Sequence, residues 1–378
     1  MTRGRTAVVR VARLLAGALM VALSLGARAA STAPLRVVVP DRDNLQYMSF
    51  WVASGGGFFA REGVDLEIVT PPGPQQTSAV LERREAEAAV LPPPLFLHAI
   101  ASGAPLVLVA NLLRHDPIDL VVRPEIAAER RLSSEGPLRA RLESMRGLRV
   151  GVAPHPPSRL RALFASVGMD ADRDVTMVIL RGPEQNPAFA SKQVDALYAH
   201  TPFLERAIVH DGAVIVVDQA RGEVPAVSQA QIHGLVVHRA VLEARRDVVA
   251  AAVRAIARAQ ERVHASQADT VGVLARTFPE RDRRELETIV RLYAPAVPDS
   301  PDVRAEAVAA GLDLFPAGMK KPDLSGIDLR AHVAPELAAE AARARSSTDR
   351  AWLVVGGVAV AVVLAVVLAA LGARRRAS

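Results

Sequence analysis

Side chains that can hold a small polar molecule recur in the loops after the predicted strands of this 378-residue chain. They are mainly amides, hydroxyls, imidazoles, a phenol and a guanidinium, which offer hydrogen bonds, ring contacts and a positive charge. In open α/β sheets, ligands bind at the carboxyl ends of strands, beside the N-termini of helices. This rule, applied to the predicted strands, gives as candidate ligand-binding residues Asn44, Gln46, Tyr47, Gly73, Gln75, Gln76, Thr77, Pro93, His155, Ser158, His200 and Thr201. Arg114 is a further candidate, outside these loops.

Two of these loops favour different ligands. The stretch from Gly73 to Thr77 stands at the start of a predicted helix, where free backbone N–H groups suit an anion. A plain helix-capping role for Thr77 is an equally good interpretation. The triple proline around Pro93 offers carbonyls and an apolar wall but no donors, so it favours a ring or an alkyl group over a bare oxyanion.

Some candidates have a competing structural interpretation. Tyr47 is explained equally well as part of a hydrophobic core, and for Trp51 the core is the better explanation. His155 and Ser158 open a predicted helix and are placed to face a cleft. A lone loop histidine, however, is more often simply solvated.

Two further loops are candidates because of their position between predicted halves of the chain. His200 and Thr201 follow a strand in the second half that matches the strand before the triple proline, which favours a binding role. Arg114 and His115 follow an apolar run. They either counter the negative charge of a ligand or lie in an exposed loop between two lobes.

The sequence lacks the residue sets of the common catalytic and metal centres. It has no cysteine, which excludes a disulfide framework, a thiolate metal site and a cysteine nucleophile. It contains no G-x-S-x-G, H-E-x-x-H or P-loop motif, and its triple glycine falls inside a helical pattern. The histidines are scattered, and only His233 and His238 weakly match metal-ligand spacing. We therefore expect no catalytic residue, no metal and no cofactor.

Alternating strands and helices predict the α/β fold that positions these loops. Apolar runs at 35–39, 64–69 and 86–91 are predicted strands, and a helical pattern at 49–61 is interrupted by three glycines. Another helix is expected at 75–84. Strands that alternate with helices predict a mostly parallel sheet.

The second half of the chain repeats the first. The run L-R-V-V-V at 35–39 is matched by L-R-V-G-V at 148–152. A strand, a proline and the following helix between 87 and 100 recur between 195 and 208 at one common offset of 108 positions. A shared offset through three elements indicates two lobes of one design, although generic α/β similarity is the alternative.

After residue 233 the pattern changes to a strand at 234–237 and long helices rich in alanine and arginine, from about 245 to 292. These helices are expected to return and complete the first lobe. The stretch from 331 to 350 is polar and rich in alanine, and is predicted to be a helical stalk. A disordered tether explains it equally well.

The N-terminal segment has the three parts of a secretory signal peptide. Its first 29 residues hold five arginines and no acid, and an apolar run at 14–25 precedes Ala27-Arg28-Ala29. About 20 apolar residues are needed to cross a bilayer, so an uncleaved membrane helix is the weaker interpretation.

The C-terminal segment is predicted to cross a membrane. Residues 352–371 carry no charge, begin with Trp352 and are followed by an arginine triplet at 374–376. Arginines stay on the cytoplasmic side of a membrane, so both ends of the chain predict an extracytoplasmic domain with a single-pass anchor in the cytoplasmic membrane.

Charge is concentrated in these two end segments. The whole chain carries a net charge of +6, but without the eight arginines of the ends 38 basic residues face 40 acidic ones. A nucleic-acid-binding domain should carry its excess of positive charge on the folded part, so nucleic acid is not an expected partner.

Several segments resemble one known family. They are N-L-Q-Y at 44–47, F-W-V-A at 50–53, G-F-F at 57–59, E-G-V-D-L at 62–66, and pieces at 85–91, 145–152 and 193–196. In this order they resemble the periplasmic binding proteins of the nitrate, sulfonate, taurine and thiamin-pyrimidine group, over about residues 35–329.

The resemblance implies a type II periplasmic binding protein fold, with two doubly wound lobes, a hinge of crossing strands and a ligand between the lobes. The implied partner is an ABC permease in the membrane, and a monomer is expected. The predicted C-terminal single transmembrane helix departs from the free or lipid-attached members of the group. A tether raises the effective concentration of the receptor near its permease.

The expected function is capture of a small heterocyclic or oxyanion-bearing solute for import. One alternative is a membrane-anchored sensor with the same binding fold. It would have to signal through a partner protein, because its predicted cytoplasmic tail of seven residues is too short for a catalytic domain. A remote alternative is an exported enzyme, since the family has a branch that makes the thiamin pyrimidine. That branch depends on a cysteine cluster, which this chain lacks.

These expectations divide the chain into seven parts. They are a signal peptide at 1–29, the first part of lobe 1 at 30–122, lobe 2 at 123–232, the return to lobe 1 with C-terminal helices at 233–330, a stalk at 331–351, a transmembrane helix at 352–371 and a cytoplasmic tail at 372–378.

Overall fold

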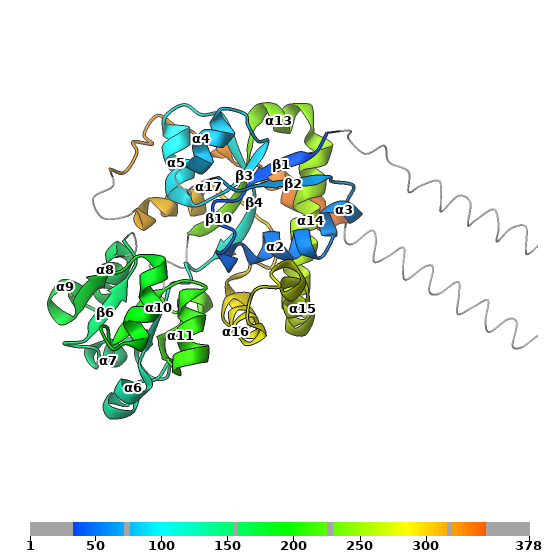
Figure 1. The fold of residues 1–378 in the computed structure, drawn as a ribbon. Coiled ribbons are helices and arrows are strands. Elements are labelled where there is room, and N and C mark those ends of the chain that lie inside the picture. The colour runs from blue at the N-terminus through cyan, green and yellow to red at the C-terminus, as the bar shows by residue number, and fades with distance from the viewer. Residues whose placement is uncertain (1–32, 72–75, 155–156, 225–229, 316–319, 345–378) are drawn as a thin grey trace, which may run out of the picture.

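Two lobes, each built on one five-stranded sheet with helices packed on it, make up the described part of the chain (Figure 1). The structure is a computed structural model, and it describes residues 33–71, 76–154, 157–224, 230–315 and 320–344. The first sheet has the order β2-β1-β3-β10-β4. Its strands are β1 Leu35–Val38, β2 Leu66–Val69, β3 Ala88–Leu91, β4 Leu106–Arg114 and β10 Gln231–His238.

The second sheet has the order β7-β6-β8-β5-β9, the same topology as the first. Its strands are β5 Asp119–Val122, β6 Arg149–Val152, β7 Thr176–Ile179, β8 Ala196–Ala199 and β9 Val214–Val217. In each sheet three strands pair in parallel, and the strand that crosses from the other lobe pairs antiparallel with both neighbours. The predicted internal repeat is therefore confirmed, and β8 follows β3 at the offset found in the sequence.

The chain crosses between the lobes at 115–118, from β4 to β5, and again between β9 and β10. Because β5 pairs with β8 and β9, the expected lobe boundary between 122 and 123 lies on the wrong side of β5. The expected boundary between 232 and 233 likewise divides β10. A short apolar run is compatible with either sheet, and only its pairing decides which sheet it joins.

The first predicted helix is broken by its glycines, as expected. It forms α2 Met48–Gly55 and α3 Phe58–Arg61, after a single 3-10 turn η1 Leu45–Tyr47. Gly57 has a φ of 69°, which disfavours side chains, and a Cβ on Gly56 would lie 2.6 Å from the Val52 carbonyl oxygen. The other helices of the first half are α4 Thr77–Glu82 and α5 Pro93–Ala101.

The second lobe carries most of the remaining short helices. They are α6 Pro124–Arg130, α7 Leu138–Glu143, α8 Pro157–Ala165, α9 Ala171–Asp174, α10 Gly182–Ala190, α11 Phe203–Asp211 and η3 Gln219–Arg221. The core of this lobe packs Phe164 and Tyr198 among aliphatic side chains, and both are fully buried.

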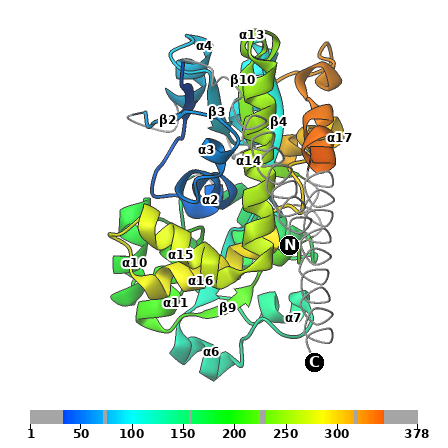
Figure 2. The ribbon, with the colours of Figure 1, turned by 90° about the vertical axis from the view of Figure 1, so that its right-hand side faces the viewer.

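The return segment contains the longest helix, α14 Arg246–Ala265, which packs against α2 and α3 of the first lobe (Figure 2). Its apolar face is buried, as expected of a core-facing amphipathic helix. The other elements are α13 Arg239–Ala244, α15 Gln267–Thr277, α16 Arg283–Tyr293, η4 Ala294–Ala296, α17 Ala305–Ala309, η5 Ala310–Leu314 and η6 Leu329–His332. Because α16 also packs on α11, it touches both lobes.

The predicted stalk is wrong for residues 331–344, which belong to the first lobe. Val333 bridges to Leu108 of β4, and residues 335–344 form a helix. Leu337 and Ala341 on this helix are buried in the core, and Glu340 pairs with Arg246 at 2.6 Å. The alanine-rich sequence looked polar, but its apolar residues share one helix face that packs on the lobe.

Among the helices of the described residues, none has the length and apolar character that crossing a membrane requires. The predicted signal peptide at 1–29 and the predicted transmembrane helix at 352–371 lie outside the described residues.

Candidate ligand-binding cleft

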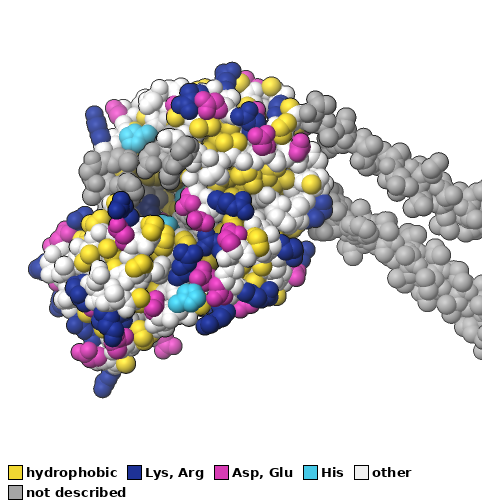
Figure 3. Space-filling view, in the orientation of Figure 1, with side chains coloured by type: hydrophobic (Ala, Val, Ile, Leu, Met, Phe, Trp, Pro, Cys, Tyr) yellow, Lys and Arg dark blue, Asp and Glu magenta, His cyan; other side chains and the backbone are white. Residues whose placement is uncertain are grey.

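Five of the side chains predicted from the strand ends lie where the two lobes meet: Asn44, Gln46, Tyr47, His200 and Thr201. Figure 3 shows a recess between the lobes at this place. The contacts that follow come from the loops after β1, β6 and β8, from β10, from the crossing segment 115–118 and from the helices α2, α8 and α16. This is the arrangement expected of a cleft at the carboxyl ends of strands.

The first lobe contributes a chain of polar contacts that starts at Asn44. The Asn44 side chain accepts a hydrogen bond from the backbone N–H of Gln46 at 2.9 Å. The Gln46 side-chain oxygen lies 3.2 Å from Nε2 of His233, which stands on β10. The ring of Tyr47 packs edge-on against the same imidazole, with centroids 4.8 Å apart. Trp51 is buried below and donates to the Asn44 carbonyl at 3.3 Å, which confirms its place in the core.

The carbonyl of Pro117, in the crossing segment, joins this chain to the second lobe. It accepts hydrogen bonds from Nε2 of Gln46 at 3.4 Å and from the hydroxyl of Tyr293 at 2.9 Å. The Tyr293 hydroxyl in turn accepts the backbone N–H of Thr201 at 2.8 Å. One carbonyl therefore links the first lobe, the return segment and the second lobe.

A buried ion pair lies beside this junction. Nη1 of Arg159, in α8, is 2.9 Å from Oδ1 of Asp116, whose side chain is completely buried. Burial raises the pKa of the Asp116 carboxyl, while the positive charge of Arg159 acts to lower it. Asp116 adopts a φ of 43°, which an aspartate tolerates better than most residues.

Both cleft histidines are neutral at neutral pH. Burial lowers the pKa of His233 to about 3, and burial also lowers the pKa of His200. Nδ1 of His200 lies 2.6 Å from the Thr201 carbonyl oxygen. The negative charge of Asp41 reaches both His200 and Tyr47. It acts to raise the pKa of His200, against the larger effect of burial, and it acts together with burial to raise the pKa of Tyr47.

The other candidates lie around this network or outside the described residues. The Ser158 hydroxyl is buried and finds no hydrogen-bond partner among the described residues. Pro93 is buried, packs against Gly311 and lines a small cavity next to His233. The remaining three candidates, Gly73, Gln75 and His155, lie in the stretches that are not described.

Gln76 and Thr77, the two described residues of the stretch predicted to suit an anion, differ in their exposure. Gln76 is exposed and occupies the N-cap of α4, without a side-chain capping bond. The side chain of Thr77 is fully buried, so the alternative that Thr77 is the helix cap is wrong. Their role in ligand binding stays a prediction.

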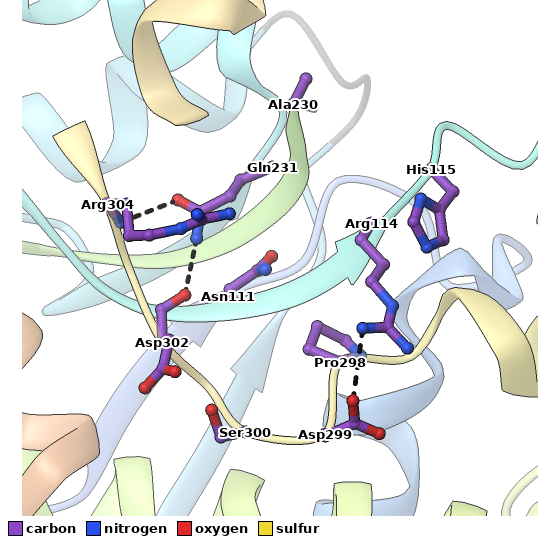
Figure 4. Close-up of a pocket in the computed structure, with 10 residues that line it drawn as sticks. All are labelled: Asn111, Arg114, His115, Ala230, Gln231, Pro298, Asp299, Ser300, Asp302 and Arg304. Atoms are coloured by element: carbon purple, nitrogen blue, oxygen red, sulfur yellow. Dashed lines mark hydrogen bonds and ion pairs between the residues drawn. The ribbon is translucent and has the colours of Figure 1, made fainter. Parts of the chain in front are cut away.

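Arg114 lies apart from the network, in a hinge pocket of about 460 Å³ (Figure 4). Its Nη1 is 3.4 Å from Oδ2 of Asp299, and its Nε donates to the Pro295 carbonyl at 3.4 Å. Across the pocket, Gln231 donates to the Asp302 carbonyl at 2.6 Å. The positive charge of Arg114 is thus paired with Asp299 of the return segment.

Sequence reasoning missed four of the residues that organise the cleft. Asp116, Arg159, His233 and Tyr293 come from four elements, and no local pattern joins them. The only available signals were the Asp-Pro pair in the predicted inter-lobe loop and the arginine at the expected start of α8. Tyr293 carried none, because it ends an ordinary amphipathic helix.

A second contact between the lobes contains a buried acid with an unusual pKa. Glu205, on α11, is completely buried against the return segment, and burial raises its pKa to about 7. The charged groups around it are Glu285 and Arg281 at α16 and Asp119 on β5. Glu285 itself accepts from His210 at 2.8 Å.

Replacing Glu205 by glutamine is expected to raise the free energy of unfolding by about 3 kcal/mol at pH 8 and to change it little at pH 4. The unfolded chain releases this proton near pH ~4.3, whereas the folded protein keeps it up to about pH 7. Wild-type stability should therefore fall between these two pH values. Urea unfolding of both proteins at pH 4 and pH 8 measures the effect. The exposed Glu306→Gln serves as control, and an equal difference at both pH values would contradict the prediction.

A model of the family described as NMT1/THI5 like matches residues 44–269. The chain belongs to this family. The matched range begins at Asn44 and runs through both crossing segments, so it includes every described residue of the cleft network except Asp41 and Tyr293.

Three solved structures share the fold of this NMT1/THI5-like chain. The periplasmic aliphatic sulphonate binding protein of Escherichia coli is 16% identical, with a TM-score of 0.56 over 75% of this chain and 86% of its own. The alkanesulfonate-binding protein of Xanthomonas axonopodis pv. citri, bound to MOPS, is 17% identical, with a TM-score of 0.54 over 83% of this chain and 99% of its own. The periplasmic nitrate-binding protein of Synechocystis PCC 6803 is 12% identical, with a TM-score of 0.58 over 84% of this chain and 90% of its own.

Among proteins whose function has been curated, none matches this chain significantly. The resemblance to the nitrate, sulfonate and thiamin-pyrimidine group is confirmed by the family match and by these structures. The NMT1/THI5-like chain has the periplasmic binding protein fold found in the substrate-binding proteins of ABC importers. The three proteins named above are binding proteins.

Proposed function

We propose that this NMT1/THI5-like protein captures a small uncharged or cationic heterocycle between its lobes and delivers it to an ABC permease. The observation that carries this proposal is the charge of the cleft. Among the described residues around the network, the positive charge of Arg159 is matched by Asp116, and Asp41 adds a second carboxylate. His200 and His233 are neutral, so the network as a whole does not favour an anion.

The chemistry of the walls supports a ring-shaped ligand. Tyr47 and His233 present aromatic rings, while Gln46 and Asn44 present amides that both donate and accept hydrogen bonds. A neutral heterocycle with ring nitrogens and an exocyclic polar group uses both kinds of contact. Pro93 adds an apolar surface without donors.

Binding is proposed to act on the contacts between the lobes. A ligand that touches Gln46 from one lobe and His200 from the other gains its full set of contacts only when the lobes are close. It therefore shifts the population toward a closed form. Small-angle scattering of the full chain in detergent should show compaction at saturating ligand.

The place of capture is proposed to be outside the cytoplasmic membrane, with the chain held there by residues 352–371. This part of the proposal rests on the sequence alone: the basic and apolar N-terminal segment, and the uncharged run of residues before three arginines. A tethered receptor stays near its permease without diffusing through the compartment.

The first experiment is mass spectrometry of small molecules that co-purify with the full chain in detergent. Calorimetry then follows with the molecule found and with the thiamin pyrimidine, taurine and nitrate as probes. Gln46→Ala and His200→Ala are each expected to weaken binding of the heterocycle about tenfold, or about 1.4 kcal/mol, the loss typical of one buried hydrogen bond.

Gln193→Ala is the matched control, because Gln193 is exposed on the second lobe and outside the cleft. Its affinity should equal that of the wild type. Tight binding of nitrate or taurine instead of a heterocycle would overturn the ligand class but leave capture intact. No binding of any probe and no co-purified molecule would favour the partner-dependent sensor.

A further inference from the structure

A groove rich in arginine lies on the first lobe, at the end of α2 opposite to the cleft. The chain of cleft contacts adjoins the N-terminus of α2, and this groove begins at its C-terminus, at Gly55 and Gly56. It holds about 400 Å³ between α3, the end of α14 and α15. The residues on its walls that matter for binding are Phe58, Arg61, Arg262, Ala268, Gly272 and Arg276.

Two of the arginines are held in place. Nη2 of Arg61 donates to the Gly56 carbonyl at 2.7 Å, and its guanidinium lies over the Phe58 ring at 4.3 Å. Nη1 of Arg262 is 2.5 Å from Oδ2 of Asp269. A guanidinium fixed in this way loses little freedom when it binds an anion through its remaining N–H groups.

The third arginine has no charge partner within the described part of the chain. Arg276 is exposed on α15, and no hydrogen bond or ion pair is found for its side chain among these residues. The groove thus has three positive charges and one negative charge, that of Asp269. The groove therefore has an excess of positive charge, whereas the ligand cleft has an excess of negative charge.

The floor of the groove is open to a group of moderate size. Ala268, Gly272 and Arg276 follow one another at intervals of four residues on α15 and so share one helix face. A Cβ placed on Gly272 would have only Arg276 within 4 Å, at 3.7 Å from Nη1. A phosphate group has room between this floor and the three guanidinium groups.

The groove and the helix that ends the described chain both lie along α14. Figure 2 shows α2, α3, α14 and α15 on one face. Along α14, Arg254 and Arg258 both hold Glu62, the neighbour of Arg61, at 2.7 Å. Arg246, at the start of α14, pairs with Glu340 of the helix at 335–344 at 2.6 Å, so α14 connects the groove with the last described helix.

The length of the remaining chain places this surface near a membrane. From Ala344, the last described residue, to Trp352, where the predicted transmembrane helix starts, eight residue steps reach at most about 29 Å. This step rests on the membrane anchor included in the proposed function. The surface beside Ala344 then lies within about 29 Å of the start of the membrane helix.

We propose that the groove binds the phosphate of an anionic phospholipid headgroup and so orients the lobes relative to the bilayer. The arginines supply bidentate hydrogen bonds and an excess of positive charge, and the small residues of α15 supply space. Anionic membrane surfaces attract clusters of arginine near them. The cleft is left free, because it adjoins the other end of α2.

The test uses the full chain in a nonionic detergent. Calorimetry follows binding of short-chain phosphatidylglycerol, short-chain phosphatidylcholine and inorganic phosphate. We expect saturable binding of phosphatidylglycerol and an affinity loss of at least about tenfold in the double variant Arg61→Gln, Arg276→Gln. Arg291→Gln, an exposed arginine of α16 outside the groove, should bind within about twofold of the wild type, because exposed charges away from a site contribute little.

Each other outcome overturns the proposal. Binding of inorganic phosphate as tight as that of phosphatidylglycerol, with the same loss in the double variant, would assign the groove to free phosphate. Equal binding of phosphatidylcholine, no binding, or an unchanged affinity in the double variant would exclude a headgroup site. Unfolding temperatures and cleft-ligand affinity, which should match the wild type, show that the variants fold. Carbonate extraction of membranes tests the anchor separately, and so distinguishes a failure of the anchor from a failure of the groove.

Discussion

Replacement of Arg159 by leucine is expected to lower the free energy of unfolding by about 3–5 kcal/mol at pH 7. The Asp116 carboxylate is completely buried, and Arg159 is the cation that pairs with it, at 2.9 Å. The second oxygen of Asp116 has no hydrogen-bond partner in the described residues. Without Arg159, an uncompensated charge would remain buried at the crossing point of the two lobes. Urea unfolding followed by circular dichroism measures the loss.

The loss should depend on pH. Burial already raises the pKa of Asp116, and removing the nearby positive charge raises it further. A carboxyl whose pKa is raised on folding penalises the folded state above its unfolded pKa of about 3.9, so the loss should shrink as the pH falls from 7 toward 4. Adding Asp116→Asn to the leucine variant should recover much of the stability at pH 7.

Arg161→Leu is the matched control in the same helix. Arg161 pairs with Asp172 at 2.7 Å, but both side chains are about half exposed. Exposed ion pairs contribute roughly 0–1 kcal/mol, so this variant should remain close to the wild type. Equal losses for Arg159→Leu and Arg161→Leu would show that burial of Asp116 does not govern the stability of the hinge.

Replacement of Leu337 by alanine is expected to cost about 2–5 kcal/mol of unfolding free energy. Leu337 is fully buried in the core of the first lobe, where the helix at 335–344 packs near α14. Deleting its side-chain methyls leaves a cavity that the surrounding helices fill only in part. Thermal unfolding of the two proteins at one concentration measures the difference.

Glu336→Ala tests the same helix on its exposed side. This residue points away from the core, and its replacement should change the free energy of unfolding by less than about 0.5 kcal/mol. If the segment were a free stalk, the two substitutions would have equally small effects. That result would contradict the packing of residues 335–344 on the lobe.

Local sequence patterns determined the strands, most helices and the internal repeat. The apolar runs at 35–39 and 86–91 contain β1 and β3, and the glycines from the end of α2 onward break the predicted helix where expected. Short-range periodicity and the conformational freedom of glycine act within a few residues, so they can be recognised without knowledge of the fold. The offset of 108 positions also predicted the shared topology of the two sheets.

The sequence determined part of the cleft as well. Asn44, Gln46, Tyr47, His200 and Thr201 were predicted from the strand-end rule, and the structure brings them to the junction of the lobes. The rule succeeds because the strand direction alone decides which loops share an edge of a sheet.

The tertiary structure alone decided the contacts that join the lobes. Gln46 meets Pro117 of the crossing segment across 71 positions, Thr201 meets Tyr293 across 92, and Arg159 meets Asp116 across 43. The same is true of β5, whose sheet depends on its partners, and of Leu337, whose burial depends on the lobe core. Periodicity reports which face of one element is apolar, but which distant side chains meet depends on how whole elements pack, and no local pattern carries that information.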